Sequence, residues 1–354
     1  MASPFATTNT RFPVMGAGAL RVGSVVFAER FDEFITWLHV AEEVGLDVIG
    51  LGDSQNLWGD LYVSLTLAAM HTTTARLGPM VTNPVTRHPA VAAGAMASLQ
   101  QVSGGRMFFG IGTGDSATSN LGRRPSTVAH FEAYCRAVQG LGAGADVEWD
   151  GRPIRMSWPA DAAPLWMAAE GPRTLHLAGQ IADGVIIGCG LTDDVVRDCQ
   201  ARIRAGAESV GRNYDDIELW WYAKPYLAAT EEEGWAALRW TIAGSAMHTF
   251  RYAADQKFVP PELLGPIEQL HREFAHHTHG KVSKGEFNSA LVERLGLTDF
   301  LGRRFALAGP PALIVERIAH LMSLGATNLI VAQLVPDRAG FLRDFDRLVI
   351  RELR

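Results

Sequence analysis

Short apolar segments alternate with longer amphipathic segments along most of this 354-residue chain. The short segments are apolar at successive positions, which is typical of parallel strands covered on both faces. In the first longer segment, Phe31, Phe34 and Leu38 recur at helical spacing, and Gly45 is placed to end a helix. The pattern predicts strands at 21–27, 47–51, 77–82, 106–111, 165–169, 184–188, 217–226 and 328–332, and helices at 31–44, 61–73, 90–101, 127–141, 174–181, 194–210, 311–324 and 338–352.

This alternation predicts an α/β fold, and the number of repeats favours a (β/α)8 TIM barrel over an open, doubly wound sheet. Two regions interrupt it: 142–163, which is rich in Gly, Asp and Pro, and 230–300, which has helical segments and no clear strand. We expect the second region to be a helical insertion before the last strand, long enough to form a lid. No linker divides the chain, so one domain is predicted over 1–354, with 1–20 as an N-terminal extension.

The charge balance narrows the classes of partner. The chain has 32 Lys and Arg against 38 Asp and Glu, a formal net charge of −6, and no basic run. A nucleic-acid partner is therefore not expected. No apolar run approaches the roughly 20 residues that span a bilayer, and 1–20 lacks the layout of a signal peptide. We expect a cytoplasmic protein without a membrane partner.

Cysteine and histidine positions argue against disulfides and metal sites. Three cysteines without CxxC spacing fit neither a disulfide framework nor a zinc site, so buried thiols are expected. His276, His277 and His279 are close together, but only Glu273 and His277 have the one-turn spacing of paired ligands on a helix. No metal site is predicted.

Polar residues follow the second and third predicted strands. Active sites of TIM barrels lie at the C-terminal ends of the strands, so these loops are where chemistry is expected. Asp53 and Ser54 follow the second strand, and the third runs through 79–84 to Arg87 and His88. The alternative without a functional role is that Arg87 and His88 form a surface pair.

The loops after the fourth and fifth strands could receive a ligand. Glycines in 110–116 would let a ligand approach the backbone, and Asp115 supplies an acid. The segment 169–174 opens a helix whose unpaired N–H groups suit a phosphate. The alternatives are that the glycines only form a turn, that Asp115 caps the next helix, and that the last segment is an ordinary helix start.

Six motifs in a fixed order carry a family resemblance. With them the chain resembles the luciferase-like oxidoreductases, most closely the methylenetetrahydromethanopterin reductase type, over nearly all of 21–354. The motifs are AEEVG at 41–45, LGPMVTNP at 77–84, GGR at 104–106, GIGTGD at 110–115, EGP at 170–172 and ADG at 182–184.

The resemblance implies a barrel that holds FMN or the deazaflavin coenzyme F420 and has a two-electron redox role. It implies a cis peptide between Met80 and Val81 that supports the cofactor ring, and a phosphate near the helix after the fifth strand. We expect the Glu170 side chain to turn away from that phosphate or pair with Arg173. The cofactor-binding residues carried over are Asp53, Met80, Val81, Thr82, Asn83, Thr113, Thr118, Glu170, Gly171, Pro172 and Thr174.

The resemblance also implies catalytic candidates. Asp115 matches an acidic residue beside the ring of the deazaflavin members. Where many members have a histidine after the second strand, this chain has Ser54, so Asp115 and His88 are the candidate acid/base groups. The substrate pocket is predicted to include Ser54, Trp58, Trp221 and Lys224, with Trp220 as the alternative to Trp221, Tyr222 as a further wall and Lys224 as an anion contact.

The favoured function is a monooxygenase that uses reduced FMN, supplied by a partner flavin reductase, on a small organic substrate, aromatic or heterocyclic. The alternative is a reductase or dehydrogenase that transfers hydride with coenzyme F420. A second alternative is a flavin-binding barrel or partner subunit without catalysis. The resemblance also implies that the protein forms a homodimer.

Overall fold

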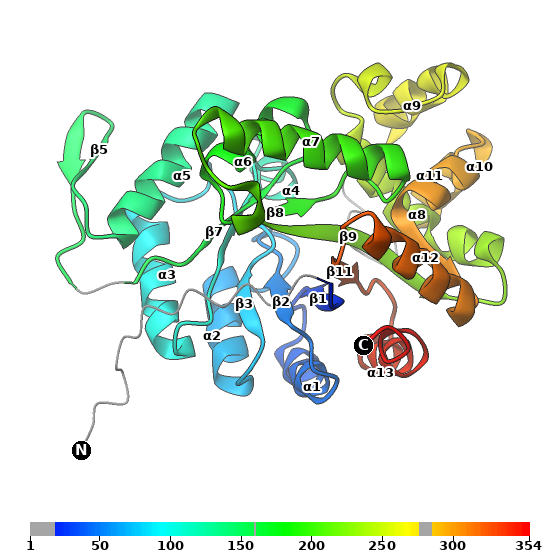
Figure 1. The fold of residues 1–354 in the computed structure, drawn as a ribbon, viewed down its shortest axis with the longest axis horizontal. Coiled ribbons are helices and arrows are strands. Elements are labelled where there is room, and N and C mark those ends of the chain that lie inside the picture. Colours follow the sequence, from blue (N-terminus) through cyan, green and yellow to red (C-terminus); the bar gives the residue numbers. More distant parts are fainter. Residues whose placement is uncertain (1–17, 159–160, 276–284) are drawn as a thin grey trace.

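The computed structural model describes residues 18–158, 161–275 and 285–354. Most of the predicted N-terminal extension and the histidines at 276, 277 and 279 lie outside these ranges. Within them, eight parallel strands form a nearly closed barrel in the order β3-β2-β1-β11-β9-β8-β7-β4 (Figure 1). Single bridges from Leu77 to Met107 and from Thr82 to Ile111 connect β3 to β4 and complete the ring. The predicted TIM barrel is confirmed. Its strands are β1 (Arg21–Val26), β2 (Val48–Leu51), β3 (Arg76–Pro79), β4 (Phe109–Ile111), β7 (Leu165–Ala168), β8 (Gly184–Ile187), β9 (Glu218–Leu227) and β11 (Asn328–Ala332).

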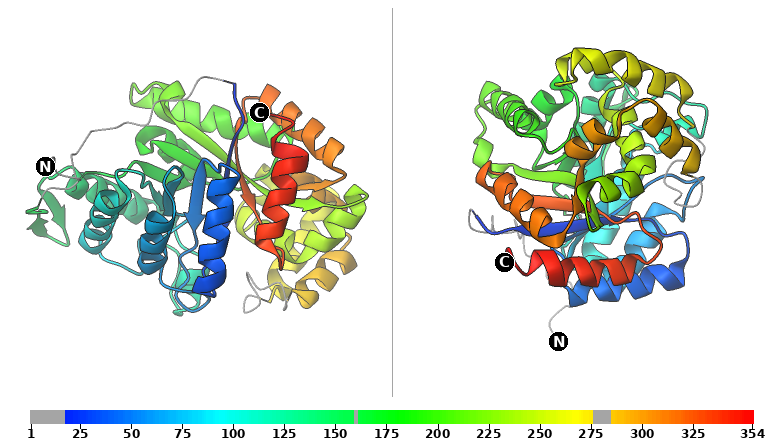
Figure 2. Two further views of the ribbon diagram at one scale, coloured as in Figure 1. Left: turned by 90° about the horizontal axis from the view of Figure 1, so that it is seen from below. Right: turned by 90° about the vertical axis from the view of Figure 1, so that its right-hand side faces the viewer.

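Helices cover the outside of the barrel because their apolar faces pack on the outward side chains of the strands. The first and last of them lie side by side, which brings the two ends of the barrel sequence together (Figure 2). The helices of this layer are α1 (Phe31–Glu43), α2 (Leu61–His71), α3 (Pro89–Ser103), α5 (Val128–Gly142), α6 (Pro172–Ile181), α7 (Asp193–Ser209), α12 (Pro311–Ser323) and α13 (Arg338–Phe345).

The first interruption contains a small hairpin that the sequence analysis does not predict. Its antiparallel strands are β5 (Val147–Trp149) and β6 (Arg152–Ile154). Asp150 and Gly151 join them with φ values of 51° and 71°. Such a two-residue turn requires residues that tolerate positive φ, which Asp and Gly do. The strands are too short to give a clear alternation in the sequence.

The second interruption is a helical insertion, as predicted, and the structure shows that it has a core of its own. Trp235, Ile242, Leu270 and Leu301 are among its fully buried side chains. Its helices are α8 (Glu231–Thr249), α9 (Pro261–Glu273), α10 (Glu286–Arg294) and α11 (Thr298–Phe305). None of the helices in the described ranges is long and apolar enough to cross a membrane.

A ninth parallel strand follows the insertion, and the prediction of no strand between 226 and 328 is wrong there. It is β10 (Ala306–Gly309), which pairs with the end of β9. The segment reads Ala-Leu-Ala-Gly, a composition with weak strand preference, so only pairing with β9 makes it a strand.

Strand β9 places alternate side chains on opposite faces of the barrel wall. Trp220 lies inside the barrel and stacks on Trp166 with ring centroids 5.4 Å apart. Trp221 points to the surrounding helices. The prediction that Trp221 lines the pocket is therefore wrong, because a strand has a period of two. The same period puts Tyr222 and Lys224 on the inner side.

A half-buried carboxylate lies with two arginines at the N-terminal end of the barrel. Glu218 lies 2.9 Å from Arg76 and 3.3 Å from Arg21, and the Trp220 indole donates to it. We expect Glu218→Gln to lower the free energy of unfolding by about 3–5 kcal/mol, because it removes the carboxylate charge that lies against the buried Arg76 guanidinium. Glu43→Gln, at an exposed pair with Arg343, should change it by less than about 1 kcal/mol. Urea denaturation measures both.

The same cluster predicts a pH dependence of stability. Burial alone would raise the pKa of Glu218, but Arg76 and Arg21 outweigh burial and hold that pKa below its ordinary value. The stabilisation is therefore present above the pKa of an unfolded glutamate and is lost as the pH falls through the lower folded pKa. Glu218→Gln should remove this part of the acid sensitivity.

Candidate active site

A cavity of about 1220 Å³ lies at the C-terminal ends of the barrel strands. Its walls are the loops after β2, β3, β4 and β7, the inner side of β9, and residues of α8. The volume exceeds the usual range for one drug-sized ligand, so a cofactor and a substrate can lie in it together.

Most of the predicted site residues line this cavity, although they come from separate loops. Those that line it are Asp53, Ser54, Trp58, Val81, Thr82, Asn83, Thr113, Asp115, Glu170, Gly171, Pro172, Thr174 and Lys224. Met80, His88, Thr118 and Trp221 are not among its lining residues. Met80 instead packs in the barrel interior, and Thr118 is fully buried beneath the loop after β4.

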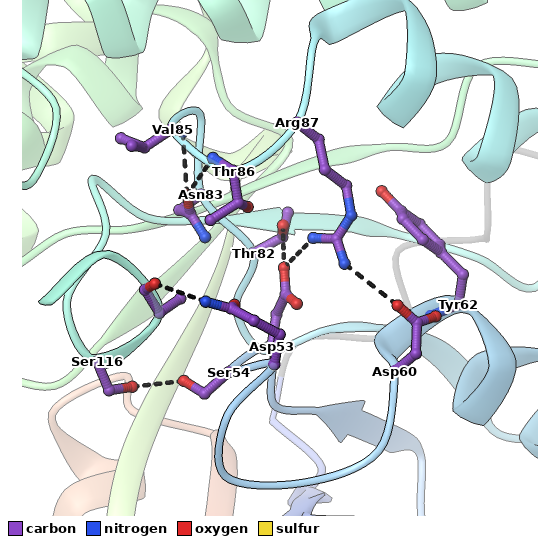
Figure 3. A network of polar contacts seen from close by, with 12 residues as sticks. Asp53, Ser54, Asp60, Tyr62, Thr82, Asn83, Val85, Thr86, Arg87 and Ser116 are labelled. Atoms are coloured by element: carbon purple, nitrogen blue, oxygen red, sulfur yellow. Dashed lines mark hydrogen bonds and ion pairs between the residues drawn. The ribbon is translucent and has the colours of Figure 1, made fainter. Parts of the chain in front are cut away.

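Asp53 ties the loop after β2 to the loop after β3. One of its carboxylate oxygens accepts hydrogen bonds from the Thr82 hydroxyl at 2.6 Å and from Arg87 at 2.5 Å (Figure 3). Arg87 also reaches Asp60 at 3.5 Å. Arg87 is therefore part of a network centred on the buried Asp53 and not half of a surface pair with His88. The network fixes the position of both loops at the cavity wall.

The segment after β3 lines the cavity with Val81, Thr82 and Asn83. The peptide bond between Met80 and Val81 is cis, as the resemblance implies. Asn83 Oδ1 accepts from the backbone N–H groups of Val85 and Thr86, both at 3.0 Å, and so holds the following turn (Figure 3). Its Nδ2 is buried and has no hydrogen-bond partner among the described residues. A donor is thus available at this wall.

Asp115 is held by the insertion. It precedes the short helix α4 (Ser116–Ser119), but its side chain makes no capping hydrogen bond, so the capping alternative is wrong. One carboxylate oxygen pairs with Arg251, and the other lies 3.4 Å from His248 Nε2. The loop after β4 and the end of α8 therefore meet at Asp115.

His88 lies away from the cavity. Its ring accepts a hydrogen bond from the N–H of Ala90 and caps α3, and it stands edge-on to Trp149 of the hairpin with centroids 6.1 Å apart. Since the side chain is exposed and already occupied as a cap, the prediction that His88 is an acid/base group of the site is wrong. Ser54, where the family histidine is missing, instead meets the Ser116 hydroxyl at 2.5 Å.

The loop between β7 and α6 forms an open helix N-terminus at the cavity. Pro172 is the first residue of α6, and the Gly171 N–H donates to the Thr174 hydroxyl at 3.2 Å. The first N–H groups of an α-helix have no acceptor within the helix. Together with the helix dipole they suit an anion.

Glu170 turns inward from the same loop. Its carboxylate accepts from the Thr249 hydroxyl at 3.2 Å, and a Cβ at Gly188 would lie 2.4 Å from it. Glycine at 188 is thus required for this orientation. No ion pair joins Glu170 to Arg173 in the described ranges, and the partner of Glu170 is Thr249 of α8 instead.

The insertion supplies cavity residues that the sequence analysis does not identify. Trp240, His248, Arg251 and Lys257 all line the cavity. His248 lies in the last turn of α8, and Arg251 lies just beyond the end of that helix. No sequence pattern links the two residues to Asp115, and only the fold shows that both reach it.

The chain is similar in sequence and in structure to known proteins. The family model described as luciferase-like monooxygenase matches residues 7–328. The F420-dependent glucose-6-phosphate dehydrogenase of Nakamurella multipartita is 31% identical over 357 residues, which is 95% of this chain and 97% of that protein. The 5,10-methylenetetrahydromethanopterin reductase of Methanolobus tindarius is 29% identical over 300 residues, covering 82% and 87%. The structure of the coenzyme F420-dependent tetrahydromethanopterin reductase from Methanopyrus kandleri is 25% identical, with a TM-score of 0.73, covering 95% and 100%.

Proposed function

Because the chain belongs to the luciferase-like monooxygenase family of oxidoreductases, we propose that it binds coenzyme F420 in the barrel-mouth cavity and transfers a hydride to or from a small organic substrate. One observation carries the choice of cofactor. The Nakamurella relative, named as F420-dependent, matches almost the whole length of this chain. The F420-dependent alternative of the sequence analysis therefore takes precedence over the FMN monooxygenase.

The polar groups of the cavity fit a deazaflavin. Asn83 Nδ2 and Trp58 Nε1 are buried donors at the cavity wall without partners among the described residues. Carbonyl oxygens of the ring system would satisfy them, because a buried donor left unpaired costs about 1–3 kcal/mol. The N-terminus of α6 would hold the cofactor phosphate, with Gly171 and Thr174 in contact.

A bound deazaflavin would supply the hydride chemistry. The protein must then hold or move the proton of the reacting hydroxyl or carbonyl group. Asp115 and His248 are the groups we assign to this task, since both line the cavity and they contact each other. Asp115 orients the His248 ring, and Arg251 holds Asp115 in place.

FMN is the second candidate cofactor because the matching family model is described as a monooxygenase. In that case a separate flavin reductase must deliver reduced FMN. The two candidates differ in their use of oxygen, since only the monooxygenase consumes it.

The test is retention of cofactor. Protein is mixed with coenzyme F420, FMN or riboflavin and desalted, and the retained absorbance is measured. We expect coenzyme F420 to be retained at low micromolar protein and FMN much less, with aerobic and anaerobic turnover equal. Retention of FMN alone with oxygen-dependent turnover would establish the monooxygenase instead, and retention of neither would favour a barrel without catalysis.

A further inference from the structure

Lys224 is a buried cation that faces the cavity. It lies on the inner side of β9 and is 5% exposed. In the part of the chain that the structure describes, its ammonium makes no hydrogen bond and no ion pair within 4.0 Å, and its one close contact of this kind is the Tyr222 ring, 4.9 Å to the centroid. Burial lowers the pKa of Lys224 to about 8, and the Glu170 carboxylate opposes that shift.

The other buried or half-buried cations of this region have partners. Lys257 donates to the Thr249 carbonyl, Arg251 pairs with Asp115, and Arg304 donates to two backbone carbonyls at 2.8 Å. Lys224 differs from them. A buried ammonium without an anion is costly, and it is typically found where a ligand supplies the missing charge.

The position of Lys224 in the barrel indicates which part of a bound ligand would contact it. In the barrel order, β9 is four strands from β3 in either direction, so it stands opposite the Met80–Val81 backbone. If the cofactor ring lies against that backbone, as the proposed function requires, a substrate fills the space between the ring and β9. The far end of the substrate then meets Lys224.

We propose that Lys224 binds an anionic group, carboxylate or phosphate, of the substrate, and that the substrate is therefore an organic anion. This proposal rests on the proposed function for the location of the cofactor. The proposal names both the class of substrate and the residue that binds it, and the names of the relatives do not identify that residue. Glu170 accepts a hydrogen bond from Thr249, and its charge opposes the effect of burial, which lowers the pKa of Lys224 to about 8.

Sulfate is a suitable probe because its charge is constant between pH 6 and 10. Its dissociation constant is measured by titration calorimetry for wild type, for Lys224→Met and Lys224→Gln, and for Arg124→Gln. Arg124 lies exposed at the same cavity, so its replacement removes one charge without removing the buried site. We expect the Lys224 variants to weaken sulfate binding by at least tenfold and Arg124→Gln by less than threefold. Two Lys224 variants are used so that one misfolded protein does not decide the result.

The pH gives an independent check. Wild-type binding should weaken about tenfold from pH 7 to pH 9, since Lys224 loses its proton above its pKa of about 8. The Lys224 variants should lack this dependence. Equal binding by wild type and both folded Lys224 variants would overturn the proposal.

Repeating the titration with cofactor-loaded protein separates the two sources of an anion. If the substrate supplies it, Lys224-dependent sulfate binding persists in the loaded protein. Its disappearance on loading would assign the anion to the cofactor and overturn the proposal. Failure to load any cofactor would refute the proposed function instead, and sulfate binding to the free protein would still report on Lys224.

Discussion

Asparagine in place of Asp115 is expected to lower turnover by about 10²–10⁴-fold, the usual contribution of a general acid or base. The amide can still hydrogen-bond to Arg251 and to His248, so the shape of the site should persist. It carries no charge, however, and cannot accept a proton as the carboxylate can. The affinity for the cofactor should change by less than about threefold. The measurements are kcat on the first substrate found for the loaded enzyme and the cofactor dissociation constant.

Asp32→Asn is the matched control for this change. Asp32 forms an exposed ion pair with Arg30 at 2.7 Å and is not among the residues that line the cavity. The same chemical change there should leave turnover, cofactor affinity and stability nearly as in wild type. If Asp115→Asn loses stability but keeps wild-type turnover per folded, loaded molecule, Asp115 only fastens α8 to the barrel and the catalytic assignment fails.

The barrel could be predicted because its signal is local. Each strand is a short continuous apolar run, each following helix shows its own hydrophobic period, and these units repeat in order. The pairing of β10 with β9 has no such signal, because Ala306–Gly309 becomes a strand only beside the end of β9. The hairpin β5–β6 is missed because its strands are partly exposed and lack the continuous apolar run of the barrel strands.

The cavity loops could be predicted because each follows a predicted strand, and the C-terminal ends of barrel strands lie together. Three site features depend on the folded structure and could not be predicted. His248 reaches Asp115 across more than a hundred residues of sequence. His88 looks like a site residue until its exposed capping position is known. Trp221 and Trp220 are adjacent, and only the register of β9 shows which one faces inward.

Valine in place of Gly171 is expected to weaken binding of the phosphorylated cofactor by about 10–100-fold. The phosphate needs close approach to the backbone at the start of α6, and each hydrogen bond to a charged group contributes roughly 1.5–3 kcal/mol. A branched side chain at 171 would occupy that space. The protein should still fold, because the backbone there is extended, with φ −109° and ψ 158°, and a Cβ would meet only the Thr174 hydroxyl at 3.7 Å.

Riboflavin isolates the phosphate contribution, since it has the ring of FMN without the phosphate. Wild type should bind FMN more tightly than riboflavin, and Gly171→Val should remove most of that margin while leaving riboflavin affinity nearly constant. Gly94→Val is the matched control: Gly94 lies in α3, where a Cβ would have open space. That variant should keep the margin. Equal affinity of the wild-type protein for FMN and riboflavin would show that the start of α6 does not bind the phosphate, whatever the ring contributes.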